Sequence, residues 1–131
     1  MGSVRYLLDT CTFLWHAQQP AMLSPAAVTV LNDAGSGLFV SDVSLWEITL
    51  KHSAGKLPLP DAPRLWIPQK LAHHQLQSLA LTHEAIFRSG ELPRVHADPF
   101  DRLLAGQAIE YSLILLSPDV SLSLLGASRV W

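Results

Sequence analysis

The chain has 131 residues and a mass of 14.4 kDa, which is enough for one domain and too little for two. With 49% hydrophobic and 15% charged residues, it is too apolar for a disordered or highly charged scaffold, and its one cysteine excludes a disulfide-stapled fold. Its net charge of −2 gives no general attraction to nucleic acid, and no apolar run reaches the ~18 residues of a membrane span. We therefore expect one domain over residues 1–131, located in a reducing cytoplasm.

Short apolar runs alternate with helical periodicity along the chain. In chain order the pattern predicts a strand at 4–8, helices at 10–17 and 25–32, a strand at 38–41, helices at 43–53 and 63–74, a strand at 75–81, helices at 83–90 and 98–111, a strand at 112–116, a short helix after 119 and an edge strand at 130–131. Pro68 predicts a kink or break in its helix. The alternation indicates an α/β fold with a parallel sheet covered by helices on both faces.

Carboxylates gather where the predicted strands end. Asp9 directly follows the first strand, Asp119 comes just after the 112–116 strand, and Glu47 lies in the first two turns after the second strand. Asp98 and Asp101 share one face of a helical first turn. Because ligands bind beyond the carboxyl ends of parallel strands, we expect these acids to meet at one edge of the sheet. Clustered carboxylates repel one another unless a cation neutralises them, and oxygen ligands indicate Mg²⁺ or Mn²⁺ rather than zinc.

Each acid also has an ordinary structural explanation. Asp9 and Asp98 each precede a helix as an N-cap does, and residues 44–47 fit a capping box in which Glu47 only bonds a backbone amide. Asp119 suits a turn. We favour one shared site, because five independent coincidences at one edge are less probable than one arrangement.

Other reactive side chains give weaker signals. His96 lies close in sequence to the acids at 98 and 101, whereas the other histidines are expected at the surface or in packing contacts. Cys11 is expected to be a small packing residue rather than a nucleophile. The sequence contains no HExxH, CxxC, GxSxG or GxxxxGK motif, so zinc, serine-nucleophile and phosphate-loop chemistries have no support.

Six sequence blocks, spread over nearly the whole chain, have the order and spacing of a known family. They are LLDT at 7–10, FLW at 13–15, SDVSLWEI at 41–48, GKLPL at 55–59, HADPFDRLLAGQA at 96–108 and LLSPD at 115–119. Together they resemble the PIN-domain family, and most of all the VapC-type toxins, the ribonuclease partners in type II toxin–antitoxin pairs. The resemblance implies a single PIN domain over 1–131, with a PIN-like three-layer α/β/α sandwich around a mainly parallel sheet of four to five strands.

The resemblance further implies a metal-dependent endoribonuclease in which metal-activated water cleaves RNA phosphodiester bonds. The positions it implies for holding one or two Mg²⁺ or Mn²⁺ ions are Asp9, Glu47, Asp101 and Asp119, with Asp98 auxiliary. The hydroxyls of Thr10 and Ser117 match family positions that orient water or phosphate. Pro118 precedes the last acid where relatives commonly carry alanine or arginine, a departure expected to shift the Asp119 carboxylate.

Partners follow from the same resemblance: an RNA substrate, a VapB-type antitoxin and a two-fold homodimer. Residues proposed for an antitoxin groove, with core packing as the alternative for each, are Phe13, Trp15, Trp46 and Leu50. Basic residues placed to contact RNA are Arg5, Lys51, Lys56, Arg94 and Arg102. The alternative function is a catalytically inactive PIN-like module that binds RNA or protein. A receiver domain is disfavoured, because it needs a lysine after its last strand and all three lysines lie in the first 70 residues.

Overall fold

One five-stranded sheet organises the structure, a computed structural model that describes residues 3–131. Its strands are β1 (Arg5–Leu8), β2 (Gly37–Ser41), β3 (Gln77–Leu79), β4 (Ile114–Leu116) and β5 (Arg129–Val130). Their order in the sheet is β3-β2-β1-β4-β5, and every neighbouring pair is parallel. The predicted α/β class is confirmed, and the sheet is parallel throughout rather than mainly so. The central position of β1 places the residue that follows it at the middle of the carboxyl edge.

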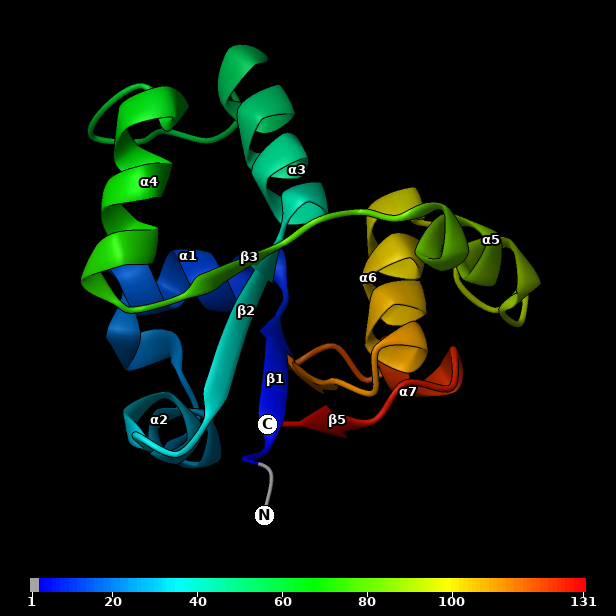
Figure 1. Ribbon diagram of the computed structural model, residues 1–131. Coiled ribbons are helices and arrows are strands. Elements are labelled where there is room, and N and C mark those ends of the chain that lie inside the picture. Colours follow the sequence, from blue (N-terminus) through cyan, green and yellow to red (C-terminus); the bar gives the residue numbers. More distant parts are fainter. Residues whose placement is uncertain (1–2) are drawn as a thin grey trace.

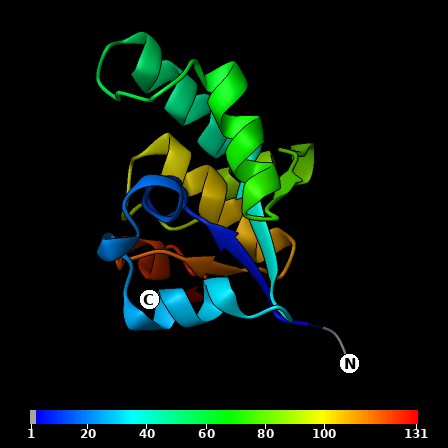
Figure 2. The same ribbon diagram turned by 90° about the vertical axis from the view of Figure 1, so that its left-hand side faces the viewer.

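Helices cover both faces of this sheet. Within residues 3–131 they are α1 (Thr10–Gln18), the 3₁₀ turn η1 (Pro20–Met22), α2 (Pro25–Asn32), α3 (Asp42–Ser53), α4 (Pro63–His73), α5 (His83–Glu91), α6 (Pro99–Glu110) and α7 (Ser121–Leu124). Helices α1, α2 and α4 lie on one side and α5, α6 and α7 on the other (Figure 1). Figure 2 shows the first group from its own side. The predicted three-layer sandwich is therefore confirmed. No helix in the described part of the chain has the length and apolarity needed to cross a bilayer.

The central strand supplies two separate cores. Leu7 and Leu8 point to opposite faces of the sheet, as successive strand residues do, and both are fully buried. Leu7 belongs to a cluster that includes Leu104 of α6, whereas Leu8 belongs to a cluster that includes Phe13 of α1 and Trp66 of α4. Because helices cover both faces of β1, its consecutive residues Leu7 and Leu8 are both apolar rather than alternately apolar and polar.

Two local predictions were wrong. Of the kink or break predicted at Pro68, the break was wrong, because α4 runs as one helix from Pro63 to His73. Both Pro68 and Arg64 are exposed, so water can bond the carbonyl whose helical donor the proline removes. The third strand is shorter than predicted, because Gln75 has a left-handed backbone (φ 55°) that belongs to the turn after α4, and pairing with β2 begins only at Gln77.

Candidate functional site

Asp9 is fixed at the point where β1 becomes α1. Its Oδ1 accepts a hydrogen bond from the amide of Thr12 at 2.9 Å, which confirms it as the N-cap of α1. Its Oδ2 accepts from Ser117 Oγ at 2.5 Å, and the residue is only 6% exposed. Capping and a place at the sheet edge are therefore compatible, because the two carboxylate oxygens serve different partners.

Glu47 reaches the same edge from α3 and is held by a hydroxyl and a lysine. Thr10 Oγ1 donates to Glu47 Oε1 at 2.6 Å and lies 2.9 Å from Ser44 Oγ. Lys51 Nζ lies 2.5 Å from Glu47 Oε2, one helical turn away. This hydrogen bond is the main reason why the pKa of Lys51 is raised, and the charges of Asp98 and Asp101 add to the effect. We call Asp9 and Glu47 the buried pair.

The capping box at 44–47, which was the alternative explanation for Glu47, does not form. Ser41, three residues earlier, caps α3 by accepting a hydrogen bond from the amide of Val43 at 2.9 Å. Ser44 consequently lies inside the helix, where it is buried, and Glu47 points to Thr10 rather than to a backbone amide. The capping explanation for Glu47 is thereby removed.

The first turn of α6 supplies two further acids. Asp98 is the N-cap, since its Oδ1 accepts from the amides of Phe100 and Asp101 at 2.9 and 3.3 Å. Asp98 is exposed, whereas Asp101, at the third helical position, is half-buried. Burial raises the pKa of Asp101, and the charges of Asp98 and Asp119 add to that effect, while a hydrogen bond to His96 opposes it. Ionisation of Asp101 is therefore less favourable in the folded protein than for an ordinary aspartate in water.

His96, Asp101 and Asp119 form the second group, which we call the open triad. His96 Nε2 lies 2.8 Å from Asp101 Oδ2, and one ligand atom from each of the three side chains lies within 4.8 Å of the others. The bond to Asp101 raises the pKa of His96. Asp119 Oδ1 accepts from the amide and the hydroxyl of Ser121 at 2.9 and 2.6 Å, and these bonds lower its pKa. The Pro118 departure does not separate this carboxylate from Asp101.

Ser117 joins the buried pair to the open triad. Its hydroxyl donates to Asp9 Oδ2, and its oxygen accepts the amide hydrogen of Asp119 at 3.0 Å. Asp9 and Glu47 thus lie along the same carboxyl edge of the sheet as the open triad, and the ligand atoms of the triad lie close enough together to fit one divalent cation. His96, which the sequence singled out for its place near the acids at 98 and 101, is the member that the predicted ligand set did not include.

Cys11 lies beside the buried pair but is unsuited to be a nucleophile. Its Sγ is 3.4 Å from Asp9 Oδ1. Burial, and then the negative charge of Asp9, raise the pKa of this thiol above its usual range. The thiolate is therefore disfavoured, in agreement with the expected packing role.

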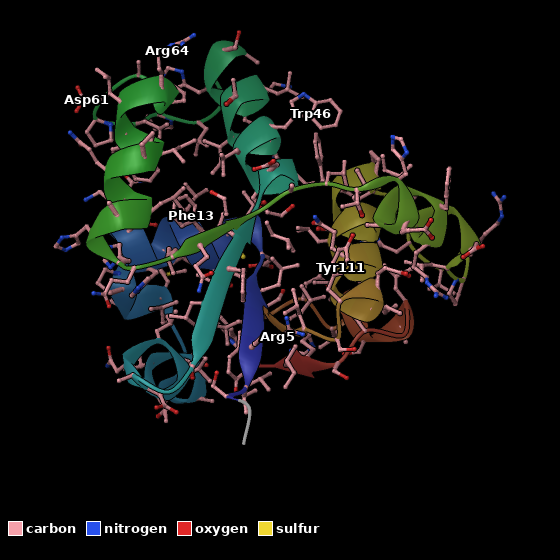
Figure 3. All side chains as sticks on the ribbon, viewed as in Figure 1. Arg5, Phe13, Trp46, Asp61, Arg64 and Tyr111 are labelled. Atoms are coloured by element: carbon pink, nitrogen blue, oxygen red, sulfur yellow. The ribbon has the colours of Figure 1, made fainter. Side chains whose placement is uncertain are left out.

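The residues predicted for an antitoxin groove separate into three environments. Phe13 is fully buried and packs edge-on against Trp66, so its assignment to a groove was wrong: α4 covers the face of α1 that carries it. Trp15 is half-buried against Trp131. Trp46 is 53% exposed and Leu50 46%, both on α3. Figure 3 shows Phe13 within the molecule and Trp46 projecting outward from α3.

Three of the five predicted RNA-contacting cations have other partners. Arg5 donates to the carbonyl of Tyr111 at 2.7 Å, and Lys51 is paired with Glu47. Arg102 donates to four backbone carbonyls, those of Ser89, Leu92, Pro93 and His96. Lys56 and Arg94 remain exposed. The prediction was wrong for Arg102, whose guanidinium is used inside the protein.

Comparison with known proteins agrees with this fold. Residues 6–126 match the PIN domain. VapBC2 from Rickettsia felis, solved with a promoter DNA fragment, has a TM-score of 0.72 at 14% identity, over 97% of this chain and 98% of that one. DNA-bound VapBC from Salmonella typhimurium gives 0.63 at 18% identity over 97% of both chains, and FitAcB from Neisseria gonorrhoeae gives 0.61 at 15% over 96% of both. At these identities the likeness shows the fold. No curated protein matches significantly by sequence.

Proposed function

Because the chain belongs to the PIN-domain family, we propose that it is a metal-dependent endoribonuclease that acts as the toxin of a toxin–antitoxin pair. The observation that carries the proposal is the convergence of the open triad with Asp9, joined through Ser117, at the carboxyl edge of the sheet. The solved structures of similar fold, several of them toxin–antitoxin complexes, support the toxin role.

In this proposal the carboxylates hold one or two Mg²⁺ or Mn²⁺ ions. The holding residues are Asp9, Asp101 and Asp119, with Glu47 completing the set and Asp98 auxiliary. A bound ion would lower the pKa of a water molecule and neutralise charge on the scissile phosphate. The hydroxyls of Thr10 and Ser117 both donate to carboxylates, so their task is to fix the directions of Glu47 and Asp9.

The test is cleavage of single-stranded RNA with and without added metal. We expect cleavage in Mg²⁺ or Mn²⁺, none with a chelator, and none for Asp9→Asn or Asp101→Asn, which remove one charge each. Either variant cutting RNA at the parent rate would show that the site is misassigned. RNA binding without cleavage under all conditions would support the alternative, a catalytically inactive PIN-like module.

We place the antitoxin along α3. Trp46 and Leu50 present apolar surface there, and a separate groove of about 700 Å³ lies between α3 and α4, lined by residues that include Leu45 and Ile67. Aromatic anchors in such grooves give most of the affinity for an extended or helical segment. A basic side chain of the antitoxin would then reach toward Asp101. Co-expression with the protein encoded by the adjacent gene should give a complex that cuts RNA more slowly than the free chain, and Leu50→Lys should prevent it from forming.

A homodimer completes the proposal. The 49% apolar composition leaves large hydrophobic side chains exposed, among them Ile86 and Phe87 of α5 and Val95. Covering such side chains is the usual driving force for self-association. Light scattering at micromolar concentration should give twice the chain mass, and the monomer mass would contradict this part of the proposal.

A further inference from the structure

His96 lies on the connection between α5 and α6, with its imidazole among the acids. Its Nε2 is 2.8 Å from Asp101 Oδ2, and a carboxylate oxygen of Asp119 lies within 4.8 Å of both groups. Neighbouring ligand atoms around a six-coordinate ion with bonds of about 2.1 Å are about 3 Å apart. The nitrogen and the Asp101 oxygen therefore already have the spacing of two ligands of one ion, and Asp119 is close enough to serve as a third.

The backbone that carries His96 is fixed to the helix that carries Asp101. Arg102, the next residue along α6, donates to the carbonyls of Ser89, Leu92, Pro93 and His96 at distances between 2.8 and 3.1 Å. Hydrogen bonds from a guanidinium are stronger than those between neutral groups. The imidazole is consequently presented to the acids by an anchored segment, so little conformational freedom is lost when it binds an ion.

We infer that His96 is a metal ligand and that the open triad is a mixed nitrogen–oxygen site that prefers transition-metal dications such as Mn²⁺ to Mg²⁺. This inference rests on the metal-dependent function proposed above and deepens it. Mg²⁺ takes oxygen ligands and gives up water reluctantly, whereas imidazole nitrogen suits transition metals. An all-carboxylate site would have no nitrogen ligand to supply this preference.

The test is pulsed electron paramagnetic resonance of Mn²⁺ bound to the full chain. We expect nitrogen-14 hyperfine coupling of the kind given by a directly bound imidazole, and its loss in His96→Gln. The same variant should weaken Mn²⁺ binding, measured by calorimetry, by about tenfold or more and Mg²⁺ binding by less than about twofold. His83→Gln, which changes an exposed histidine of α5, is the matched control and should keep both the coupling and the affinities.

The outcomes separate this inference from the proposed function. If the parent protein shows no nitrogen coupling, or His96→Gln keeps it, His96 is not a ligand, whatever the RNA assay gives. If the coupling depends on His96 but RNA is not cut in any metal, the ligand assignment stands and the nuclease proposal fails. Equal losses of Mn²⁺ and Mg²⁺ affinity in His96→Gln would overturn the metal preference.

Discussion

The buried pair and the open triad lie along one edge of the sheet but are built differently. Asp9 and Glu47 are less than a tenth exposed, and hydroxyl, amide or lysine donors satisfy their oxygens. Asp101 and Asp119 are only partly buried, and the charges of Asp98 and Asp119 oppose the ionisation of Asp101. The buried acids are therefore parts of the fold as well as of the site, whereas Asp101 is held there at a cost to stability.

The largest expected effect comes from removing one acid of each group. Asp9→Ala and Asp101→Ala should both lower RNA cleavage by about 100-fold or more. Asp9→Ala should also reduce the free energy of unfolding by about 2 kcal/mol, because it removes a helix cap and leaves the Ser117 hydroxyl without its acceptor. Asp101→Ala should change it by less than about 1 kcal/mol, since the lost bond to His96 is offset by relief from burial and repulsion. Urea denaturation measures the difference, and equal destabilisation would contradict the comparison.

The second expected effect concerns the packing of α5 against α6, the helix that carries Asp101 of the open triad. Gly106 of α6 faces α5 so closely that an added Cβ would lie 2.9 Å from the Ala85 carbonyl oxygen and 3.1 Å from the Ser89 amide nitrogen. Gly106→Ala should therefore separate the two helices and reduce the free energy of unfolding by about 2 kcal/mol.

Gly90 provides the control for this substitution. It lies in α5, and a Cβ there would meet nothing within 4 Å. Gly90→Ala should leave stability unchanged or raise it by up to about 1 kcal/mol, because alanine favours the helix. Thermal unfolding of the two variants compares them directly. Similar melting temperatures would show that the close packing of α5 on α6 does not require glycine at position 106.

The third prediction tests the interior bonding of the buried pair. Thr10→Val keeps the side-chain shape and removes the hydroxyl that contacts Glu47 and Ser44. The loss should reduce the free energy of unfolding by about 1–2 kcal/mol, because a buried carboxylate oxygen loses its donor. Thr49→Val is the control: this exposed residue of α3 bonds only the Leu45 carbonyl, and its change should stay within about 0.5 kcal/mol. Urea denaturation at neutral pH gives the free energy of unfolding of both variants. Equal losses in the two would contradict a role for the Thr10 hydroxyl in holding Glu47.

The smallest effect concerns pH and lies outside both groups. The rings of His16 on α1 and His74 after α4 are 4.2 Å apart, and burial, with the neighbouring histidines, lowers the pKa of His74 to about 4. The unfolded chain therefore binds this proton more readily, so the stability due to neutral His74 is complete above about pH 6.5 and is lost as the pH falls toward 4. His74→Gln should flatten the decline in melting temperature over this range. An unchanged decline would show that acid sensitivity arises elsewhere, with the acidic edge as the first candidate.

Local patterns predicted the parts of this molecule that depend on neighbours in the chain. The caps at Asp9 and Asp98 and the strand-end position of the acids follow from a few adjacent residues. Contacts between distant segments were beyond such patterns. The burial of Phe13 depends on where α4 packs, and only the folded connection between α5 and α6 shows that Arg102 serves backbone carbonyls. His96 was noted near the acids at 98 and 101 but was not predicted as a ligand, because the pattern did not show that Asp119 lies beside it.

The double role of Asp9 bears on how relatives of this chain diverge. One of its oxygens caps α1 and the other accepts a hydrogen bond from Ser117 after β4, so under the proposed function a lineage that stopped cutting RNA would still lose about 2 kcal/mol of stability on replacing it. Asp101 contributes little to stability, so substitutions at this position can accumulate once selection for catalysis ends. An intact position 9 is therefore weak evidence that a related sequence is an active nuclease, and an intact position 101 is strong evidence.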